Sequence, residues 1–273
     1  MTEVDAIKRC TDGPVTFDSL CTDLRALGVQ SGMVMIVHSS LTALGWVSGG
    51  PQAVVLALQE VLGLQGTLVM PTHSGDFSDP GHWEQPPVPE DWWETIRQTM
   101  PVFDPDMTPT RGMGRIVECF RSQRDTLRSN HPHLSFAARG PLEEQITGNH
   151  GLAYSLGEDS PLARLYELDA WVLLLGVKHG HNTSLHLAEC RAKNAGSRTI
   201  QAQAPVLVDD RRQWVTFTDV AYDADEDFIK IGEAFESQAD QLRVAKIGYG
   251  EGRLFRQRSL VDYAVKWIEE HRA

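Results

Sequence analysis

The sequence predicts an α/β fold, with a central mixed sheet flanked by helices and a C-terminal antiparallel β elaboration. Short apolar runs rich in β-branched residues alternate with helical patterns through the first two-thirds of the chain. The last third instead contains two extended runs separated by a charged turn. A length of 273 residues, 41% of them hydrophobic, suffices for one large core, so we expect a single domain over residues 1–273.

The first quarter of the sequence predicts two helices, each followed by a strand. Residues 16–29 carry helical apolar spacing and begin with a capping residue, Thr16. The run MVMIV at 33–37 has the composition of a buried strand. The next helix is expected over 51–63, because it starts with proline and ends in glycine, and GTLVM at 66–70 predicts the second strand.

A long irregular segment follows, from Pro71 to about Pro89, and loops of this length are typically lids or binding loops. Beyond it we expect two helices, a buried strand, an antiparallel hairpin and a closing helix capped by Ser259. These elements are predicted at residues 141–146, 160–168, 171–177, about 197–222 and 259–271.

The bulk properties exclude several classes of protein. A net charge of −12 argues against nucleic acid as a partner, because phosphate binding requires a basic face. The apolar runs are too short to span a bilayer, and the N-terminal residues do not resemble a secretory signal. The 4 cysteines have no metal-like spacing, which favours reduced thiols. We therefore expect a cytoplasmic protein, and we expect it to be a monomer or homodimer.

The loop between the first strand and the second helix is a candidate anion site. His38, Ser39 and Ser40 end the strand, and a glycine-bearing loop leads to the helix that starts at Pro51. Free amides and the helix dipole favour negative charge there. No P-loop lysine or dinucleotide glycine pattern is present. The alternative is a tight connection without a ligand.

A second close-approach loop is predicted in TPTRGMGRIVECF, residues 108–120. Its proline and two glycines precede a helical stretch, and Arg111 and Arg115 would be available to a phosphate. An ordinary loop-to-helix transition explains the same pattern.

The segment HGHNTSLHLAEC, residues 179–190, permits three interpretations. If Thr183 caps a helix, His186 and Glu189 share one face, as a general base and its carboxylate partner would. His179 and His181 could instead join that pair around a metal, or the histidines could be structural. Cys190 is disfavoured as an acyl acceptor, because adjacent helical residues point about 100° apart.

Acidic residues gather in two regions. In DVAYDADEDF, residues 219–228, the aspartates imitate the start of a calcium loop, but the required glycine and closing glutamate are missing. The long loop adds further carboxylates, among them Asp76 and Asp104. A negative patch facing a cationic ligand remains possible, as does simple solvation.

Several long motifs, taken in order along the chain, resemble the aminoglycoside 3-N-acetyltransferases, the antibiotic acetyltransferase family distinct from the GNAT enzymes. The first begins at VHSSLTALGW and the last ends at SLVDYAVKWI, so the resemblance covers nearly the whole chain. The motifs between them are TPTRGMGRIVECFR, RSNHPHLSFAARG, LGEDSPLARLYELDAWVLLLGV, HNTSLHLAE, IGEAF and GRLF.

The resemblance implies an enzyme that transfers an acetyl group from acetyl-CoA directly to the 3-amino group of a 2-deoxystreptamine aminoglycoside, conferring antibiotic resistance without a metal. His186 would be the general base, Glu189 its partner, and His38 a third catalytic residue. The acetyl-CoA contacts it implies are Ser39, Ser40, Leu41, Thr72 and Met113. The carboxylates predicted to bind the cationic substrate are Asp76, Asp104, Glu158 and Asp159.

Two other functions remain open on the sequence. One is a metal-dependent hydrolase that uses His179, His181, His186 and Glu189. The other is a non-enzymatic module that binds polycations through its acidic surface.

Overall fold

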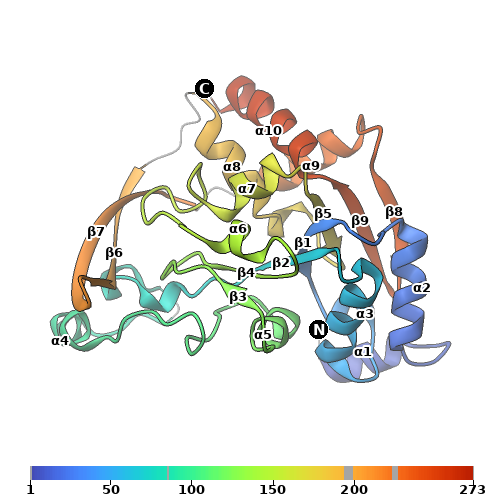
Figure 1. Cartoon of the computed structure of the whole chain (residues 1–273), viewed down its shortest axis with the longest axis horizontal. Coiled ribbons are helices and arrows are strands. Elements are labelled where there is room, and N and C mark those ends of the chain that lie inside the picture. The colour runs from blue at the N-terminus through green and yellow to red at the C-terminus, as the bar shows by residue number, and fades with distance from the viewer. Residues whose placement is uncertain (1, 85, 194–198, 223–226, 273) are drawn as a thin grey trace.

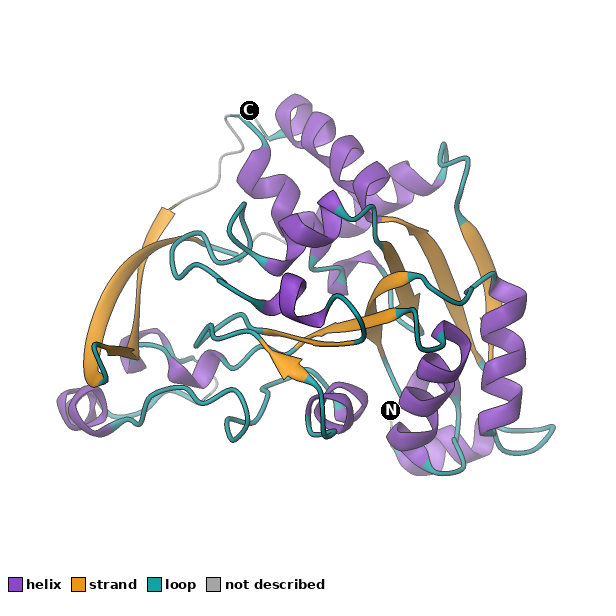
Figure 2. Ribbon diagram, in the orientation of Figure 1, coloured by secondary structure: helices purple, strands orange, loops and turns teal. Residues whose placement is uncertain are grey.

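The computed structural model describes residues 2–84, 86–193, 199–222 and 227–272. Within these residues, a seven-stranded mixed sheet is covered by helices, and a two-stranded ribbon stands apart from it (Figure 1). Figure 2 shows the ribbon at one side of the molecule and the larger sheet, with the helices that cover it, toward the other. The predicted α/β class, mixed sheet and antiparallel elaboration are confirmed.

The centre of the sheet is parallel. β1 (Val34–Ser39) lies between β2 (Thr67–Pro71) and β5 (Trp171–Leu175) and runs parallel to both. The carboxyl ends of these strands therefore meet at one edge of the sheet. The outer strands pair antiparallel, in the overall order β3-β4-β2-β1-β5-β9-β8. They are β3 (Leu127–Arg128), β4 (Phe136–Arg139), β8 (Arg243–Ile247) and β9 (Gly250–Arg256).

The apolar composition of β1 follows from its place in the sheet, because a central parallel strand is buried on both faces. Met35 and Val37 belong to one hydrophobic core and Ile36 to the other, and all three are 0% exposed. Two helical layers supply the rest of these cores. The first layer holds α2 (Phe17–Leu27), α3 (Gly50–Leu62) and α5 (Arg115–Arg121). The second holds α6 (Glu143–Thr147), α7 (Pro161–Glu167), α8 (Ser184–Arg191), α9 (Phe228–Glu236) and α10 (Gln257–His271).

Two peripheral helices and several single turns complete the described chain. None of the helices in the described ranges is long and apolar enough to cross a bilayer. The peripheral helices are α1 (Glu3–Arg9) and α4 (Trp93–Thr99). The 3₁₀ turns are η1 (Thr42–Leu44), η2 (Gly75–Phe77), η3 (Pro80–His82), η4 (Glu90–Trp92) and η5 (His179–His181).

The predicted helix caps are partly correct. The Thr16 hydroxyl accepts a hydrogen bond from the Ser19 amide in a capping box at the start of α2. The prediction for Ser259 is wrong, because α10 begins at Gln257, with Arg256 in the cap position. The chain passes directly from β9 into this helix. The Gln257 amide donates to the Ala170 carbonyl, so tertiary structure supplies the bond that a capping side chain would make.

The ribbon consists of β6 (Thr199–Val208) and β7 (Arg211–Val220), as predicted, although residues 197 and 198 lie outside the described residues. Asp209 and Asp210 form its two-residue turn, with φ of 48° and 57°. His133 ties the ribbon to the body, because its Nε2 lies 3.2 Å from the Gln203 carbonyl and 3.1 Å from that of Phe77. Beyond the end of β7 lies Tyr222, whose ring centroid is 4.8 Å from that of His186.

Candidate active site

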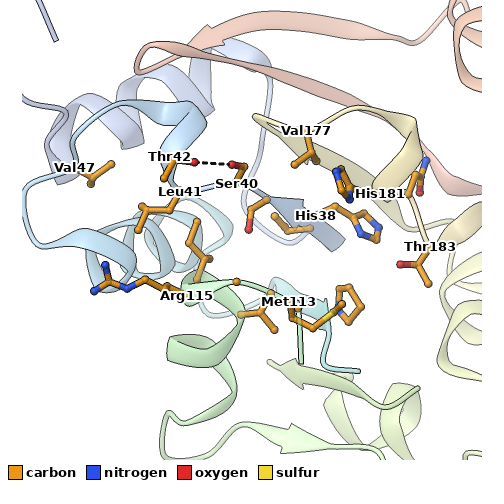
Figure 3. Close-up of a pocket in the computed structure, with 18 of the residues that line it drawn as sticks. His38, Ser40, Leu41, Thr42, Val47, Met113, Arg115, Val177, His181 and Thr183 are labelled. Carbon is orange, nitrogen blue, oxygen red and sulfur yellow. Dashed lines mark hydrogen bonds between the residues drawn. The ribbon is translucent and has the colours of Figure 1, made fainter. Parts of the chain in front are cut away.

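A cavity of about 850 Å³ opens where the parallel strands end. In open α/β sheets this edge is the usual ligand site, because the loops after adjacent strands diverge there. Residues that follow β1, β2 and β5 all line the cavity, and the N-terminal ends of α3 and α5 complete it. Figure 3 shows Arg115 and Leu41 at one end, with His38, His181 and Thr183 at the other.

The end of β1 presents two buried polar atoms without partners. The His38 side chain is 4% exposed, and its Nε2 forms no hydrogen bond. The Ser39 hydroxyl is similarly unsatisfied. Burial lowers the pKa of His38 to about 3, so its imidazole is neutral at physiological pH. Buried polar atoms are normally satisfied, so the orphaned atoms indicate a place where a ligand could supply partners.

The chain after β2 contributes His73, whose importance the sequence did not reveal. Its Nε2 is buried without a partner, and the ring packs edge-on against Phe136 at a centroid distance of 5.6 Å. Burial also lowers the pKa of His73 to about 3. Thr72 lies just before it but does not line the cavity. Its hydroxyl instead lies 3.1 Å from Ser135 Oγ and accepts a hydrogen bond from Arg128.

The two histidines in the loop after β5, His179 and His181, lie in different surroundings. His179 is buried, stacks on Phe255 and contacts Glu236 through Nε2 at 2.9 Å. Its ring packs so closely on Gly232 that a Cβ there would lie 2.0 Å away. His179 therefore anchors the loop to α9. His181 is exposed and lines the cavity.

Thr183 occupies the N-cap position of α8 but makes no capping bond, so its predicted role is only half correct. Its backbone is already helical, because the η5 turn leads almost directly into α8. Asn182 caps in its place, with its side-chain oxygen accepting from the Ser184 amide at 3.2 Å. The Thr183 side chain faces the cavity instead.

His186 and Glu189 form the pair that their helical spacing predicted. His186 Nδ1 lies 2.6 Å from Glu189 Oε2, and the Glu189 side chain is 4% exposed. With Nδ1–H donating to the carboxylate, Nε2 carries the lone pair and makes no hydrogen bond within the described residues. The rings of Tyr222 and Phe228 lie 4.8 Å from the imidazole and hold it in place.

At the other end of the cavity, glycines bring the backbone close to the ligand space. Gly49 and Gly50 begin α3, and Gly112 and Gly114 precede α5, all with positive φ. A Cβ on either Gly112 or Gly114 would meet nothing within 4 Å, so conformation rather than crowding requires glycine there. Arg115 is exposed at this rim and has no ion-pair partner among the described side chains. This end is suited to an anionic group.

Comparison with known proteins identifies the group to which this site belongs. A sequence model described as "Aminoglycoside 3-N-acetyltransferase" matches residues 36–269. The chain belongs to this family. The predicted family and acyltransferase class are thus confirmed.

Individual aminoglycoside acetyltransferases match along almost their full length. The SPbeta prophage-derived aminoglycoside N(3')-acetyltransferase-like protein YokD of Bacillus subtilis (strain 168) is 44% identical over 96% of this chain and 95% of its own. Its crystal structure covers 98% of both chains with a TM-score of 0.94. Aminoglycoside N(3)-acetyltransferase VII of Streptomyces paromomycinus is 36% identical over 99% of this chain and 96% of its own. A structure of AAC-IIIb binary with CoASH is 30% identical, with a TM-score of 0.84, over 96% and 98% of the chains.

In this acetyltransferase, the structure gathers most of the residues predicted at the reaction centre. His38, Ser39, Ser40, Leu41, Met113 and His186 all line the cavity, and Glu189 lies directly behind His186. The four carboxylates predicted to bind substrate are not among the lining residues. Asp76 pairs with Arg111, and Glu158 pairs with Arg191 through two bonds. Asp104 accepts two backbone amides of its own turn, and Asp159 is exposed.

Two alternative chemistries, a metal site and a cysteine acyl acceptor, find no support in the described residues. Among the described residues, no three His, Cys, Asp or Glu side chains are grouped so as to hold a metal, so the cluster proposed for a hydrolase is not assembled. Burial raises the pKa of the Cys190 thiol to about 12, which keeps it protonated and a poor acyl acceptor. Of the calcium-like segment, Asp223 and Asp225 lie outside the described residues, whereas Asp227 pairs with Arg272.

Sequence reasoning missed the residues that support the His186–Glu189 pair. Tyr222 and Phe228 come from β7's end and α9, and Arg272 comes from the end of α10. Tyr222 and Phe228 lie in the acidic segment 219–228, which drew attention only for its carboxylates, and Arg272 lies in none of the motifs considered. Only the polar character of the PTHS segment after β2 could have drawn attention to His73.

Proposed function

We propose that this acetyltransferase transfers the acetyl group of acetyl-CoA directly to the 3-amino group of a 2-deoxystreptamine aminoglycoside, with His186 as the general base. The observation that carries the proposal is the position of the His186–Glu189 pair beside a cavity whose opposite rim is glycine-rich and cationic. Such a cavity can hold an elongated anionic thioester with its reactive end near an imidazole. The named relatives support the same donor and acceptor classes.

His186 supplies the step that the acceptor requires. An aminoglycoside amine arrives mostly as an ammonium, which has no free electron pair. Nε2 of His186 can take that proton, because Nδ1–H is held by Glu189 in the required tautomer. The carboxylate then stabilises the imidazolium, and the free amine attacks the acyl carbon. Collapse of the tetrahedral intermediate breaks the carbon–sulfur bond, and the departing thiolate of coenzyme A takes the proton from His186. The new amide nitrogen releases its second proton to water. General base catalysis of this kind contributes about 10²–10⁴-fold to the rate.

His38 is suited to a different role. Attack on the acyl carbon places negative charge on the acyl oxygen, which must be stabilised by fixed hydrogen-bond donors. A buried imidazole with a pKa of about 3 stays neutral and can donate one N–H without competing for the amine proton. In the tautomer that carries its proton on Nε2, this unpartnered nitrogen would donate to the oxygen. We therefore assign His38 to stabilisation of the developing oxyanion.

The remaining cavity residues fit the donor. Ser40, Leu41 and Met113 line the route between His38 and the glycine-rich rim, where the pantetheine arm would lie, and Ser39 also lines the cavity. At the rim, Arg115 and the amides at the start of α3 would meet the phosphates. The net charge of −12 opposes this anion and attracts the polycationic acceptor. We therefore expect added salt to raise the KM for the aminoglycoside.

The test is an acetyl-CoA turnover screen that follows thiol release with aminoglycosides bearing or lacking a free 3-amino group. Release should require the 3-amino group, continue in the presence of a chelator, and yield an N3-acetylated product. Thiol release that a chelator abolishes would support the metal-dependent hydrolase. Tight binding of aminoglycosides without any release would support the sequestering module.

Resistance follows directly from the product, because acetylation removes one ammonium charge from the drug. Expression of the chain in a susceptible bacterium should raise the inhibitory concentration only of those aminoglycosides that are substrates in the screen.

A further inference from the structure

We propose that Arg272, at the end of α10, is a positioning residue that orients Glu189 for its contact with His186. The inference rests on the proposed role of His186 as the base and extends the catalytic pair to the C-terminal end of the described chain. Arg272 does not line the cavity, so it would act entirely through the carboxylate.

The two oxygens of Glu189 have different partners. Oε2 faces His186 Nδ1 at 2.6 Å, and Oε1 accepts a hydrogen bond from the Arg272 guanidinium. A carboxylate held at both oxygens cannot rotate away from the imidazole. Because Glu189 is 4% exposed, few water molecules are available to replace the guanidinium. Arg272 therefore determines the plane in which the carboxylate meets the ring.

Arg272 is itself fixed by a second carboxylate. Its Nε and Nη2 donate to the two Asp227 oxygens at 2.8 and 2.6 Å in a bidentate arrangement. Its side chain is 13% exposed, and its backbone amide donates to Ile268 at the end of α10. Asp227 immediately precedes Phe228, whose ring packs on His186. One guanidinium thus joins the ends of α8, α9 and α10 around the imidazole.

The charge of Arg272 also matters. The positive guanidinium partly neutralises the negative charge of Glu189 that acts on His186. Removing the guanidinium leaves the Glu189 and Asp227 carboxylates without the cation that joins them, which makes the electrostatic potential at His186 more negative in the variant. Other titratable groups also act on the pair: His38 and His73 interact electrostatically with His186, Cys190 does so with Glu189, and the Tyr222 ring contacts the imidazole.

The chain contains a matched control for this arrangement. Arg253 is 17% exposed and pairs with Glu236 at 2.9 Å, while Glu236 contacts His179 at 2.9 Å. The sequence of groups is the same, histidine to glutamate to arginine, but His179 anchors a loop and does not line the cavity. A variant at Arg253 therefore removes a similar ion pair without touching the catalytic pair.

The experiment compares Arg272→Ala, Arg272→Lys and Arg253→Ala in the full chain by steady-state kinetics from pH 5.5 to 9. We expect Arg272→Ala to lower kcat by about 10- to 100-fold, the effect of losing one charge-assisted hydrogen bond. The KM for acetyl-CoA should change little, and the acidic limb of the kcat profile should move to higher pH. Arg272→Lys should recover part of both effects, and so should millimolar guanidinium added to Arg272→Ala. Arg253→Ala should show neither effect.

Each outcome bears on one claim. If His186→Ala retains normal turnover, the base assignment fails, and this inference fails with it. If His186→Ala is inactive but Arg272→Ala has wild-type kcat and pH profile, only the positioning role is refuted. If Arg272→Ala does not fold, the lysine variant decides, because it keeps the cation but loses the fork. A loss of kcat with an unchanged pH profile and no rescue by lysine or guanidinium would indicate a merely structural role and overturn the proposal.

Discussion

Replacing Glu189 with glutamine tests the catalytic pair at its most sensitive point. The substitution keeps the size of the side chain but removes its charge. In the native site one carboxylate accepts from both His186 and Arg272. A glutamine has only one acceptor oxygen, so its amide NH₂ must face one of these two donors. If the NH₂ faces His186, Nδ1 becomes the acceptor and Nε2 is left protonated, which disables the base.

The expected magnitude follows from the geometry. The 2.6 Å contact between His186 and Glu189 is short and buried, so water cannot substitute for the lost charge. Losing both the correct tautomer and the stabilised imidazolium should remove most of the benefit of base catalysis, about 10²–10⁴-fold in kcat. At about 1.4 kcal/mol per factor of ten, this corresponds to about 3–5 kcal/mol in the activation barrier.

The assay is thiol release at saturating aminoglycoside, with kcat and the KM for acetyl-CoA measured separately. Glu236→Gln is the matched control, because Glu236 also joins a histidine and an arginine, namely His179 and Arg253. We expect Glu236→Gln to retain kcat within about threefold of wild type, the context-dependent scatter of such measurements. A Glu189→Gln enzyme that folds and turns over at the wild-type rate would refute the acid–base role of the pair. Equal losses in both variants would show that the effect is structural.

Three further predictions concern other parts of the site. Arg115→Ala should raise the KM for acetyl-CoA by up to about tenfold with little change in kcat, and the difference should shrink in high salt because Arg115 is exposed. Gly114→Ala places a Cβ at φ 85° and ψ 168°, a conformation adopted almost only by glycine, so the midpoint of thermal unfolding should fall by an amount equivalent to about 1–3 kcal/mol. Burial lowers the pKa of His38 to about 3, so below the ordinary histidine pKa the unfolded chain takes up a proton that the folded chain does not. The free energy of unfolding, measured in urea, should therefore fall by about 2 kcal/mol between pH 7 and pH 5 from this residue, and His38→Gln should remove that share of the slope.

The fold was largely predictable because its elements depend on local pattern. The β-branched run around Met35 could only be a buried strand, and the ribbon's alternating residues on either side of Asp209 and Asp210 could only pair with each other. The start of α10 was missed because its first amide is satisfied by Ala170, a residue distant in sequence. A cap supplied by tertiary structure leaves no trace in the neighbouring residues.

The site was predicted to the extent that its members are neighbours along the chain. His186 and Glu189 are three residues apart, so helical geometry alone brings them together, and His38 to Leu41 follow a single strand. The carboxylates expected to bind substrate were predicted from composition and resemblance and not from local spacing. Composition cannot show which carboxylates an arginine already neutralises. Asp76 forms an ion pair with Arg111, and Glu158 forms one with Arg191.

The sequence by itself therefore determined the strands, the amphipathic helices, the acidic surface and the pairing of one imidazole with one carboxylate, because each depends on spacing within a few residues. Only the tertiary structure decided that His73 joins His38 beside the cavity, that His179 is an anchor, and that Arg272 reaches Glu189 from 83 residues away. These contacts join segments that meet only when the parallel strands pair and the last helix packs across them. Long-range packing of this kind is not encoded in any local pattern.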